Sequence, residues 1–595
     1  MSAVIKTDSP PKSRLAVRVG VTGHRPSGLD KAETGALLTQ IKAVLGHIRG
    51  VAEEVKSSFE SLYSDGGQPL LRVISPLAEG ADMIVAEEGL AEGYELQCAL
   101  PFARKEYEKD FTDADSVERF RTLLGKAASV LELDGSRATP DLENEAYQTA
   151  GRMVLAQSDV LIAIWDGEDE KGKGGTGQIV RESLINEIPV IWISSLSPHE
   201  IHVLMGGEYE GYKEASLREL EFRLKRVLKP QYPMKPDLSR TYFEERQPTW
   251  TWGFVFEIFC NLFSGVKYKT GGSKVSDFYE ETEEEWKKIW DACPGFPQSV
   301  KDQINEKFLV HYAWADKLAN YYSNIYRSSF TVNYLMAGFA VLFALLIPTV
   351  KKLETLWVLC ELTLIVLIIL ITAVGNLKHW HERWIDYRLL SEQLRHLRFL
   401  TPLGLTMPSF RVPAHDTYGD PRSTWVNWHF RAIVREAGMV GTTIDEHYLA
   451  AYRDFLSKQE ITGQIDYHKR NAPRLHRINH TLHIIGMGLF AMTFVTTFIH
   501  LFYHSDWLII CSAFFPALGA AIYGIRTQGE FEQLAKRSDA MSAHLENLRS
   551  ELDRPDFTSS YGLLGSIAEN TAEVMSTETL DWRIVFQSKR LVLPG

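Results

Sequence analysis

The sequence predicts a chain of two parts: an α/β doubly wound domain in the N-terminal half and an α-helical transmembrane domain of four spans, arranged as two hairpins. Two observations lead to this prediction. Strand-like and helix-like segments alternate through residues 15–230, and four apolar stretches in the C-terminal half are each long enough to cross a bilayer as a helix.

Apolar, β-branched runs in the N-terminal half are separated by amphipathic stretches. This pattern is typical of a parallel sheet that is covered by helices on both faces. We therefore expect a disordered N-terminus at 1–14 and an α/β domain over 15–230. The expected strands are residues 15–22, 70–75, 95–100, 160–165 and 189–193.

Three of these expected strands end in loops of small residues or glycine. Ligands of doubly wound sheets bind beyond the carboxyl ends of the strands, and glycine lets backbone amides approach a phosphate. We therefore expect a nucleotide or phosphorylated ligand here. The candidate ligand-binding residues are Gly23, His24, Arg25, Ser75, Ala78, Glu79, Gly80, Asp82, Asp166, Gly167, Gly174, Gly175, Thr176 and Gly177.

Four of these side chains have two interpretations each. His24 and Arg25 can donate to a phosphate, or they can pack the first turn. Glu79 and Asp82 can hold ribose hydroxyls, although Asp82 can equally cap its helix.

Three further side chains are also ambiguous. Asp166 can contact a ligand or can orient its own loop, because it follows the end of a strand. Tyr147 and Trp165 can stack on a base or can belong to the core.

Four apolar stretches define the membrane part. A short polar turn separates the two members of each pair, so each pair is expected to form a hairpin. The expected spans are 331–350, 355–375, 481–503 and 506–525.

Basic residues predict the orientation of the spans. Arg327 precedes the first span, Lys378 follows the second, Arg474 precedes the third and Arg526 follows the fourth. By the positive-inside rule, both termini and the segment between the hairpins are cytoplasmic. We therefore expect a multi-pass protein of the plasma membrane, with the lipid bilayer as one partner.

Composition limits the function further. The chain has 595 residues, of which 45% are apolar and 24% charged, and a net charge of −12 that argues against nucleic acid as a partner. Five cysteines are widely spread without a CxxC pair, so we expect neither a disulfide framework nor a metal site. No cofactor is expected other than the nucleotide-type ligand.

The order helix, hairpin, helix occurs twice, which suggests an approximate internal repeat. We place its two modules at 301–400 and 446–556. The remaining segments are a coupling region at 231–300, a cytoplasmic insertion at 401–445 and a tail at 557–595, in which residues 582–586 and 590–593 look strand-like.

Glu361 is the one acidic side chain in the interior of the expected spans, since Asp506 is the first residue of the fourth. An ionisable group at membrane depth by default faces a cavity or a partner, so Glu361 is the candidate pore residue. Alternatively, its side chain reaches the nearby membrane interface.

Three motifs in the N-terminal domain carry a resemblance. VTGHRP, SPLAEGADMIVAEEGL and SDVLIAIWDG…KGGTG resemble, in this order, the SLOG superfamily of Rossmann-like domains, which is related to LOG-type nucleotide phosphoribohydrolases, to DprA and to the N-terminal region of TRPM channels. The resemblance covers about the first 200 residues. It implies recognition of a nucleotide or nucleotide-derived ligand at the loops named above.

One motif departs from the hydrolytic members of that group, which carry a PGGxGTxxE pattern. Here the segment reads GGTGQIVRE, with Gln178 in place of Thr, Arg181 in place of Glu, and Glu182 one position late. The departure favours a sensor. The alternative is a membrane-anchored hydrolase in which Glu79, Asp166 or Glu182 acts as a general acid or base.

The two membrane modules resemble SLATT modules, on their layout and on a WxxYR motif at 384–388. This resemblance implies a ligand-gated pore or membrane-disrupting effector in prokaryotic antiviral defence. Four helices rarely enclose a pore alone, so we expect a homo-oligomer. A non-conducting, membrane-tethered binding scaffold is a further alternative.

Overall fold

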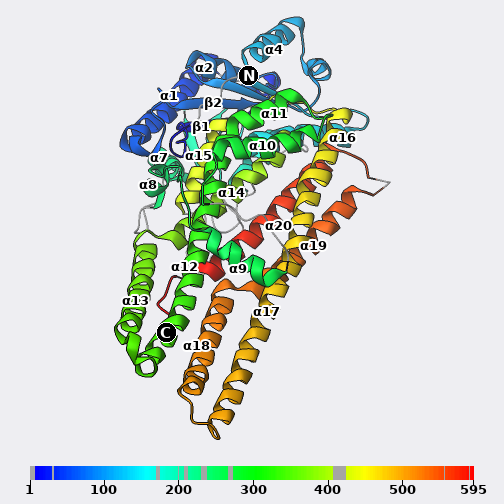
Figure 1. The fold of residues 1–595 in the computed structure, drawn as a ribbon. Helices are drawn as coiled ribbons and strands as arrows, with labels where there is room; N and C mark the ends of the chain where they lie inside the picture. Colours follow the sequence, from blue (N-terminus) through cyan, green and yellow to red (C-terminus); the bar gives the residue numbers. More distant parts are fainter. Residues whose placement is uncertain are drawn as a thin grey trace.

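The computed structural model shows a sheet domain at one end and four long helices that project from the other (Figure 1). It describes residues 7–29, 33–168, 174–198, 200–206, 212–229, 238–265, 273–406, 424–554, 557–587 and 590–594, and the statements below refer to these residues. Within the N-terminus expected to be disordered, residues 7–14 make defined contacts. The indole Nε1 of Trp314 donates to Thr7 Oγ1 at 3.1 Å, and the backbone N–H of Arg14 donates to Glu436 at 3.0 Å.

The sheet has nine strands in the order β8-β7-β6-β5-β1-β2-β3-β4-β9. All neighbouring pairs are parallel except those that involve β7 and β8, which form an antiparallel edge. The strands are β1 (Ala16–Gly23), β2 (Leu70–Ser75), β3 (Glu95–Leu100), β4 (Ser129–Glu132), β5 (Val160–Trp165), β6 (Val190–Ser194), β7 (Ile201–Gly206), β8 (Tyr212–Ala215) and β9 (Thr442–Thr443).

Helices cover both faces of this sheet. Apolar residues of α1 and α2 pack with alternate residues of β1 and β5, such as Val19 and Ile162, whereas α5 and α6 pack with Leu161 and Ala163 on the other face. The expected α/β architecture is thus confirmed. The helices of this part are α1 (Thr34–Ser58), α2 (Ala81–Ala91), α3 (Arg104–Tyr107), α4 (Ala114–Lys126), α5 (Pro140–Ala156), α6 (Thr176–Ile185) and α7 (Leu217–Leu228).

The segment expected as an insertion at 401–445 is part of the sheet domain. β9 pairs with β4 at the edge of the sheet, and α15 (Trp425–Ala437) packs against β1 and α7. Apolar side chains of α15 such as Val426 and Ile433 are buried there, which explains the docking. Residues 407–423 lie outside the described part of the chain.

The membrane part repeats one succession of elements. Each half has a short helix, a π-helical segment, a long helix, a second long helix and then a helix that follows a left-handed residue, His379 (φ 51°) or Glu530 (φ 49°). The first half is α11 (Gln298–Ile304), a π-segment (Asn305–Leu309), α12 (Val310–Thr349), α13 (Glu354–Leu377) and α14 (Trp380–Leu400). The second is α16 (Glu446–Phe455), a π-segment (Leu456–Ile461), α17 (Thr462–His500), α18 (Asp506–Gly529) and α19 (Phe531–Leu552).

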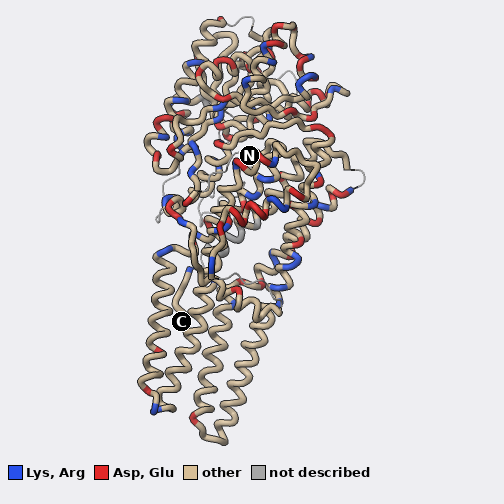
Figure 2. Tube along the Cα trace, turned by 45° about the horizontal axis from the view of Figure 1, so that its top comes forward, with Lys and Arg blue, Asp and Glu red and all other residues tan. Residues whose placement is uncertain are grey.

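Four helices are long and apolar enough to cross a membrane, as the sequence predicted. Charged residues crowd the end that carries the sheet and are sparse along these helices (Figure 2). α12 packs on α13 and on α18, and α18 packs on α17. Small residues allow α12 and α18 to lie close together: a Cβ atom on Gly338 would lie 3.6 Å from Cβ of Ala521, and a Cβ atom on Gly524 would lie 2.3 Å from the ring of Tyr334.

The segments between these units are helical. The coupling region contains α8 (Leu238–Phe243), α9 (Phe254–Ser264) and α10 (Phe278–Asp291), and the tail forms α20 (Tyr561–Gln587), which packs against α14 and α19. The prediction of a strand at 582–586 is therefore wrong. A short apolar run does not distinguish a strand from a buried helix, and here the helix that begins at Tyr561 continues through it.

Candidate functional site

The chain reverses its direction across the sheet between β1 and β5. β1 through β4 extend to one side and β5 through β8 to the other. A cavity of about 540 Å³ lies at the carboxyl ends of β1 and β5, where doubly wound sheets bind their ligands. The predicted residues that line it are Gly23, His24, Arg25, Ala78, Asp82, Asp166, Gly174, Gly175, Thr176 and Gly177.

His24 joins the three loops around this cavity. Its backbone N–H donates to the carbonyl of Ile164 at 3.0 Å, and its carbonyl accepts from the N–H of Ala81 at 3.1 Å. Its ring Nε2 lies 3.0 Å from Oδ1 of Asp166 and 3.1 Å from the backbone N of Asp166. His24 therefore both shapes the loops and presents its ring to the cavity.

Two glycines permit this close approach of loops. A Cβ atom on Gly80, which has a φ of 107°, would lie 2.5 Å from the carbonyl oxygen of His24. A Cβ atom on Gly23 would lie 2.4 Å from Cβ of Ala81. Both positions therefore require glycine for packing, whatever ligand the cavity holds.

Asp82 contributes a buried carboxyl group to the wall of the cavity. Its side chain is 4% exposed, and its Oδ1 has no hydrogen-bond partner among the described residues. Burial raises the pKa of Asp82 to about 8, although the backbone N–H of Ala78 and the charge of Arg25 oppose this shift. Gly80 occupies the N-cap position of α2, so Asp82 is not the cap that the sequence allowed. A neutral carboxyl group can donate a hydrogen bond to a ligand.

The N-terminus of α6 opens into the same cavity. Gly175 is its N-cap and supplies no side-chain hydrogen bond, which leaves the backbone N–H groups of the first turn for a ligand. The loop before α6 is held because the N–H of Gly174 donates to Oε1 of Gln178 at 2.8 Å. A helix N-terminus of this kind favours a phosphate or carboxylate.

Arg25 and Tyr147 form a charged and aromatic wall. The guanidinium carbon of Arg25 lies 5.7 Å from the centroid of the Tyr147 ring, and Nη2 of Arg25 lies 3.4 Å from Asp110. The hydroxyl of Tyr147 donates to Asp110 at 2.5 Å, and Arg137 forms an ion pair with Asp110. Sequence reasoning missed Asp110 and Arg137. Recognition of β4 would have placed Arg137 just beyond a strand end.

Gly80 does not line the described cavity, and three further predicted residues also serve the structure outside it. Glu79 accepts hydrogen bonds from the N–H and the hydroxyl of Thr112, at 3.2 and 2.7 Å, and from Ser116. The hydroxyl of Ser75 accepts from the N–H of Leu77 at 3.0 Å. Gly167, with a φ of 88°, packs near the Trp192 ring. None of the three is among the residues that line the described cavity.

The remaining acid–base candidates are also constrained. Glu182 binds Arg152 through two contacts of 2.9 Å and does not line the described cavity. Partial burial opposes ionisation of Asp166, but hydrogen bonds from the N–H of Glu168 and from His24 lower its pKa. Asp166 is thus an anion that fits an electrostatic or orienting role.

Glu361, the candidate pore residue, lies in α13 with its side chain half-buried. Most of the apolar residues of α13 around it are exposed, including Leu359 and Leu362 at 55% each.

The described residues hold no group of three His, Cys, Asp or Glu side chains that could bind a metal ion.

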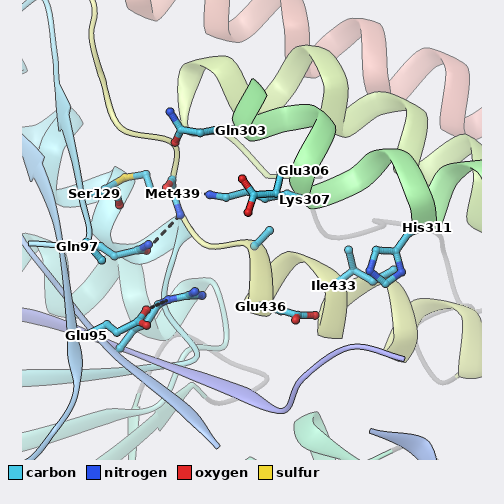
Figure 3. Close-up of a pocket in the computed structure, with 13 residues that line it drawn as sticks. Glu95, Gln97, Ser129, Gln303, Glu306, Lys307, His311, Ile433, Glu436 and Met439 are labelled. Carbon is cyan, nitrogen blue, oxygen red and sulfur yellow. Dashed lines mark hydrogen bonds and ion pairs between the residues drawn. The ribbon is translucent and has the colours of Figure 1, made fainter. Parts of the chain in front are cut away.

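A second cavity, of about 390 Å³, lies where the sheet domain meets the first long helix (Figure 3). Its walls come from β2, β3 and the start of β4, from the chain between α11 and the first turn of α12, and from α15 and the loop that follows it. Lys307 donates to the carbonyl of Met439 at 3.3 Å, and the N–H of Met439 donates to Gln97 at 3.1 Å. Burial lowers the pKa of Lys307 to about 8.

The fold and the cavities define an α/β domain joined to four helices that are long and apolar enough to cross a membrane. Comparison with known proteins adds one match. Residues 317–400 match a family described as a protein of unknown function, DUF4231. This segment comprises most of α12 together with α13 and α14. No curated protein and no solved structure matches the chain.

Proposed function

We propose that this protein is a membrane effector whose SLOG-like, Rossmann-like domain binds a nucleotide or nucleotide-derived signal and thereby gates an oligomeric pore or membrane-disrupting assembly. The four long helices are its transmembrane spans, arranged as two SLATT-like modules in the plasma membrane. Both termini and the sheet domain are cytoplasmic. Antiviral defence in a prokaryote is the setting that the sequence resemblances suggest.

The cavity at the β1/β5 reversal carries this proposal. It combines an open helix N-terminus and the guanidinium of Arg25 with the aromatic ring of Tyr147. The first two features suit phosphate groups, and the third suits a base. A nucleotide combines these two chemistries in one molecule.

Helix α5 supplies a direct connection from this cavity to the membrane part. Tyr147 and Gly151 of α5 line the cavity, and Gln157 caps the far end of the helix. Gln157 Nε2 donates to the carbonyl of Gly404 at 2.7 Å, just beyond the end of α14. Tyr147 and Gln157 are ten residues apart, or about 15 Å along a helix. A ligand that shifts α5 would therefore shift α14.

A buried carboxylate joins the coupling region to both helices of the first module. Glu245, which follows α8, accepts hydrogen bonds from the hydroxyls of Tyr322 on α12 and Tyr387 on α14, each at 2.9 Å. Arg383 on α14 donates to the same carboxylate at 3.0 Å. These contacts allow movement of α14 to reach the base of the first span.

The spans of one chain form a row, because α13 contacts α12, α12 contacts α18, and α18 contacts α17. A row encloses no channel, so conduction requires a homo-oligomer. Exposed apolar residues along α13 and α17, such as Leu370 and Phe494, leave these outer helices available to lipid or to a second copy.

Ion flux from liposomes that carry the full-length protein tests the proposal. The liposomes are challenged with linear, cyclic and ADP-ribose-type nucleotides while product formation is followed in parallel. Ligand-dependent flux without turnover is the expected result. Turnover without flux would identify an anchored hydrolase, and binding without either would identify a scaffold; both would contradict the proposal.

Two variants test the cavity within this assay. Arg25→Ala removes a phosphate donor, and Gly175→Asp places a negative charge at the N-terminus of α6. A hydrogen bond to a charged group contributes about 1.5–3 kcal/mol, so we expect the effective ligand concentration to rise about 10- to 100-fold for Arg25→Ala. Arg121→Ala is the matched control, since Arg121 pairs with Glu108 on the exposed surface. An unchanged response in both cavity variants would contradict the assignment.

A further inference from the structure

Helix α9 has one buried and one exposed apolar face. Phe256, Phe259 and Cys260 are buried, whereas Ile258 and Leu262 are 52% and 74% exposed. Ile258 and Leu262 are four residues apart and therefore lie on one side of the helix. With 11 residues, α9 is too short to cross a bilayer.

Hydrogen bonds attach α9 to the base of the first span. The backbone N–H of Phe256 donates to the hydroxyl of Ser328 at 3.0 Å, and this hydroxyl donates to the carbonyl of Gly253 at 2.8 Å. Ser328 lies just before the apolar stretch of α12. This attachment fixes the height of α9 along α12.

α9 also contacts the second module at the same height. The ring of Phe256 stacks on that of Phe531, with a centroid distance of 6.3 Å, and Phe531 begins α19 directly after α18 ends. α9 packs against α17 as well. It runs across the molecule where the four long helices leave it (Figure 1).

From this placement we infer that α9 lies in the bilayer interface on the side of the sheet domain, with Ile258 and Leu262 inserted between lipid acyl chains. Apolar residues are also exposed where the spans leave the molecule, such as Leu377 at the end of α13 and Ile484 on α17. Arg327 packs on the buried face of α9 at the same height, with its guanidinium carbon 5.5 Å from the centroid of the Phe256 ring. Apolar side chains on one face and basic groups at headgroup height are typical of interfacial helices. Lipid is thus the occupant of this face.

The contacts give α9 a mechanical role. One rigid helix rests on α12, α17 and α19, so it links the two modules at the membrane surface. A change in lipid packing that lifts or lowers α9 acts on both modules together. This inference concerns the lipid contact of α9 and holds whatever ligand the sheet domain binds.

Spin labels on the full-length protein in phosphatidylcholine–phosphatidylglycerol nanodiscs test this placement. Cys360 and Cys511, which are half-buried, are first replaced by Ser. A label is attached at Leu262→Cys, and collision rates with oxygen and with a water-soluble nickel chelate are compared. Phe222→Cys is the control in the sheet domain, because Phe222 is 67% exposed on α7, and Leu370→Cys on α13 is the control in the bilayer.

We expect the oxygen-to-nickel ratio at residue 262 to exceed that at residue 222 several-fold. A ratio equal to that at residue 222 would place α9 in water, and exclusion of both reagents would place it under protein; either result overturns the inference. If residue 370 itself behaved like residue 222, the membrane placement of the spans would fail instead, so the two failures are distinguishable.

Discussion

Arg398 and Glu460 form a buried ion pair that joins the two repeats of the membrane part. Nε of Arg398 lies 2.6 Å from Oε1 of Glu460, and Nη2 lies 3.0 Å from Oε2. Arg398 is on α14 at the end of the first repeat, and Glu460 is in the π-segment that follows α16 in the second. When one repeat moves relative to the other, this ion pair must either break or move as a unit with both repeats.

Replacement of one partner of this ion pair should lower the free energy of unfolding. Arg398→Met leaves the carboxylate of Glu460 buried without its cation, and breaking a buried pair costs about 3–5 kcal/mol. We expect a clear fall in the thermal midpoint of the detergent-solubilised protein. The double variant Arg398→Met/Glu460→Leu should recover much of this loss. If the double variant instead lost as much stability as the two single variants together, the two residues would have no coupling energy.

Asp82 should make stability depend on pH. Its folded pKa of about 8 is above its unfolded value of 3.8, so its contribution is fully present below pH 3.8 and is lost as the pH rises through 8. The loss is at most about 1.4 kcal/mol per pH unit. Asp82→Asn should therefore flatten the fall in thermal midpoint between pH 5 and 8, the range between the two pKa values. Parallel profiles for the variant and the parent would contradict the buried, neutral carboxyl group.

Lys307 should have a related effect at higher pH. Its folded pKa of about 8 is below the ordinary value of 10.5, so the charged form destabilises the fold below pH 8, and this cost disappears as the pH rises through 10.5. Lys307→Met should match or exceed the parent in thermal midpoint at pH 7. A large loss at pH 7 would instead show that the bond to Met439 dominates.

Gln157 should be needed for coupling and not for binding. Gln157→Leu removes the hydrogen bond to Gly404 and leaves the guanidinium Nη1 of Arg18 without its 3.0 Å partner. Each unsatisfied buried group costs about 1–3 kcal/mol, so a stability control is required. We expect unchanged nucleotide affinity with reduced ligand-dependent flux. Loss of affinity together with flux would place Gln157 in the binding machinery.

Most of the cavity could be predicted from the sequence, because its glycine-rich loops directly follow strongly apolar strands. The same reasoning failed where a residue's role depends on a distant partner. Glu79 is bound by Thr112 and Ser116 of the α4 region, and nothing near Glu79 in the sequence indicates this. β4 has only four residues, two of them half-buried, so its apolar pattern is too weak for the sequence to predict a strand there.

The Thr442–Thr443 strand sets the order of events during synthesis. β9 completes the edge of the sheet, yet it follows α12, α13 and α14 in the chain. The ribosome has therefore made the whole first hairpin before the sheet domain can close its edge at β4. A fragment cut at residue 230 would lack both β9 and α15 and would leave their binding surface open. Folding of the sheet domain is thus tied to the arrival of the first hairpin, and truncation studies should retain at least residues 7–445.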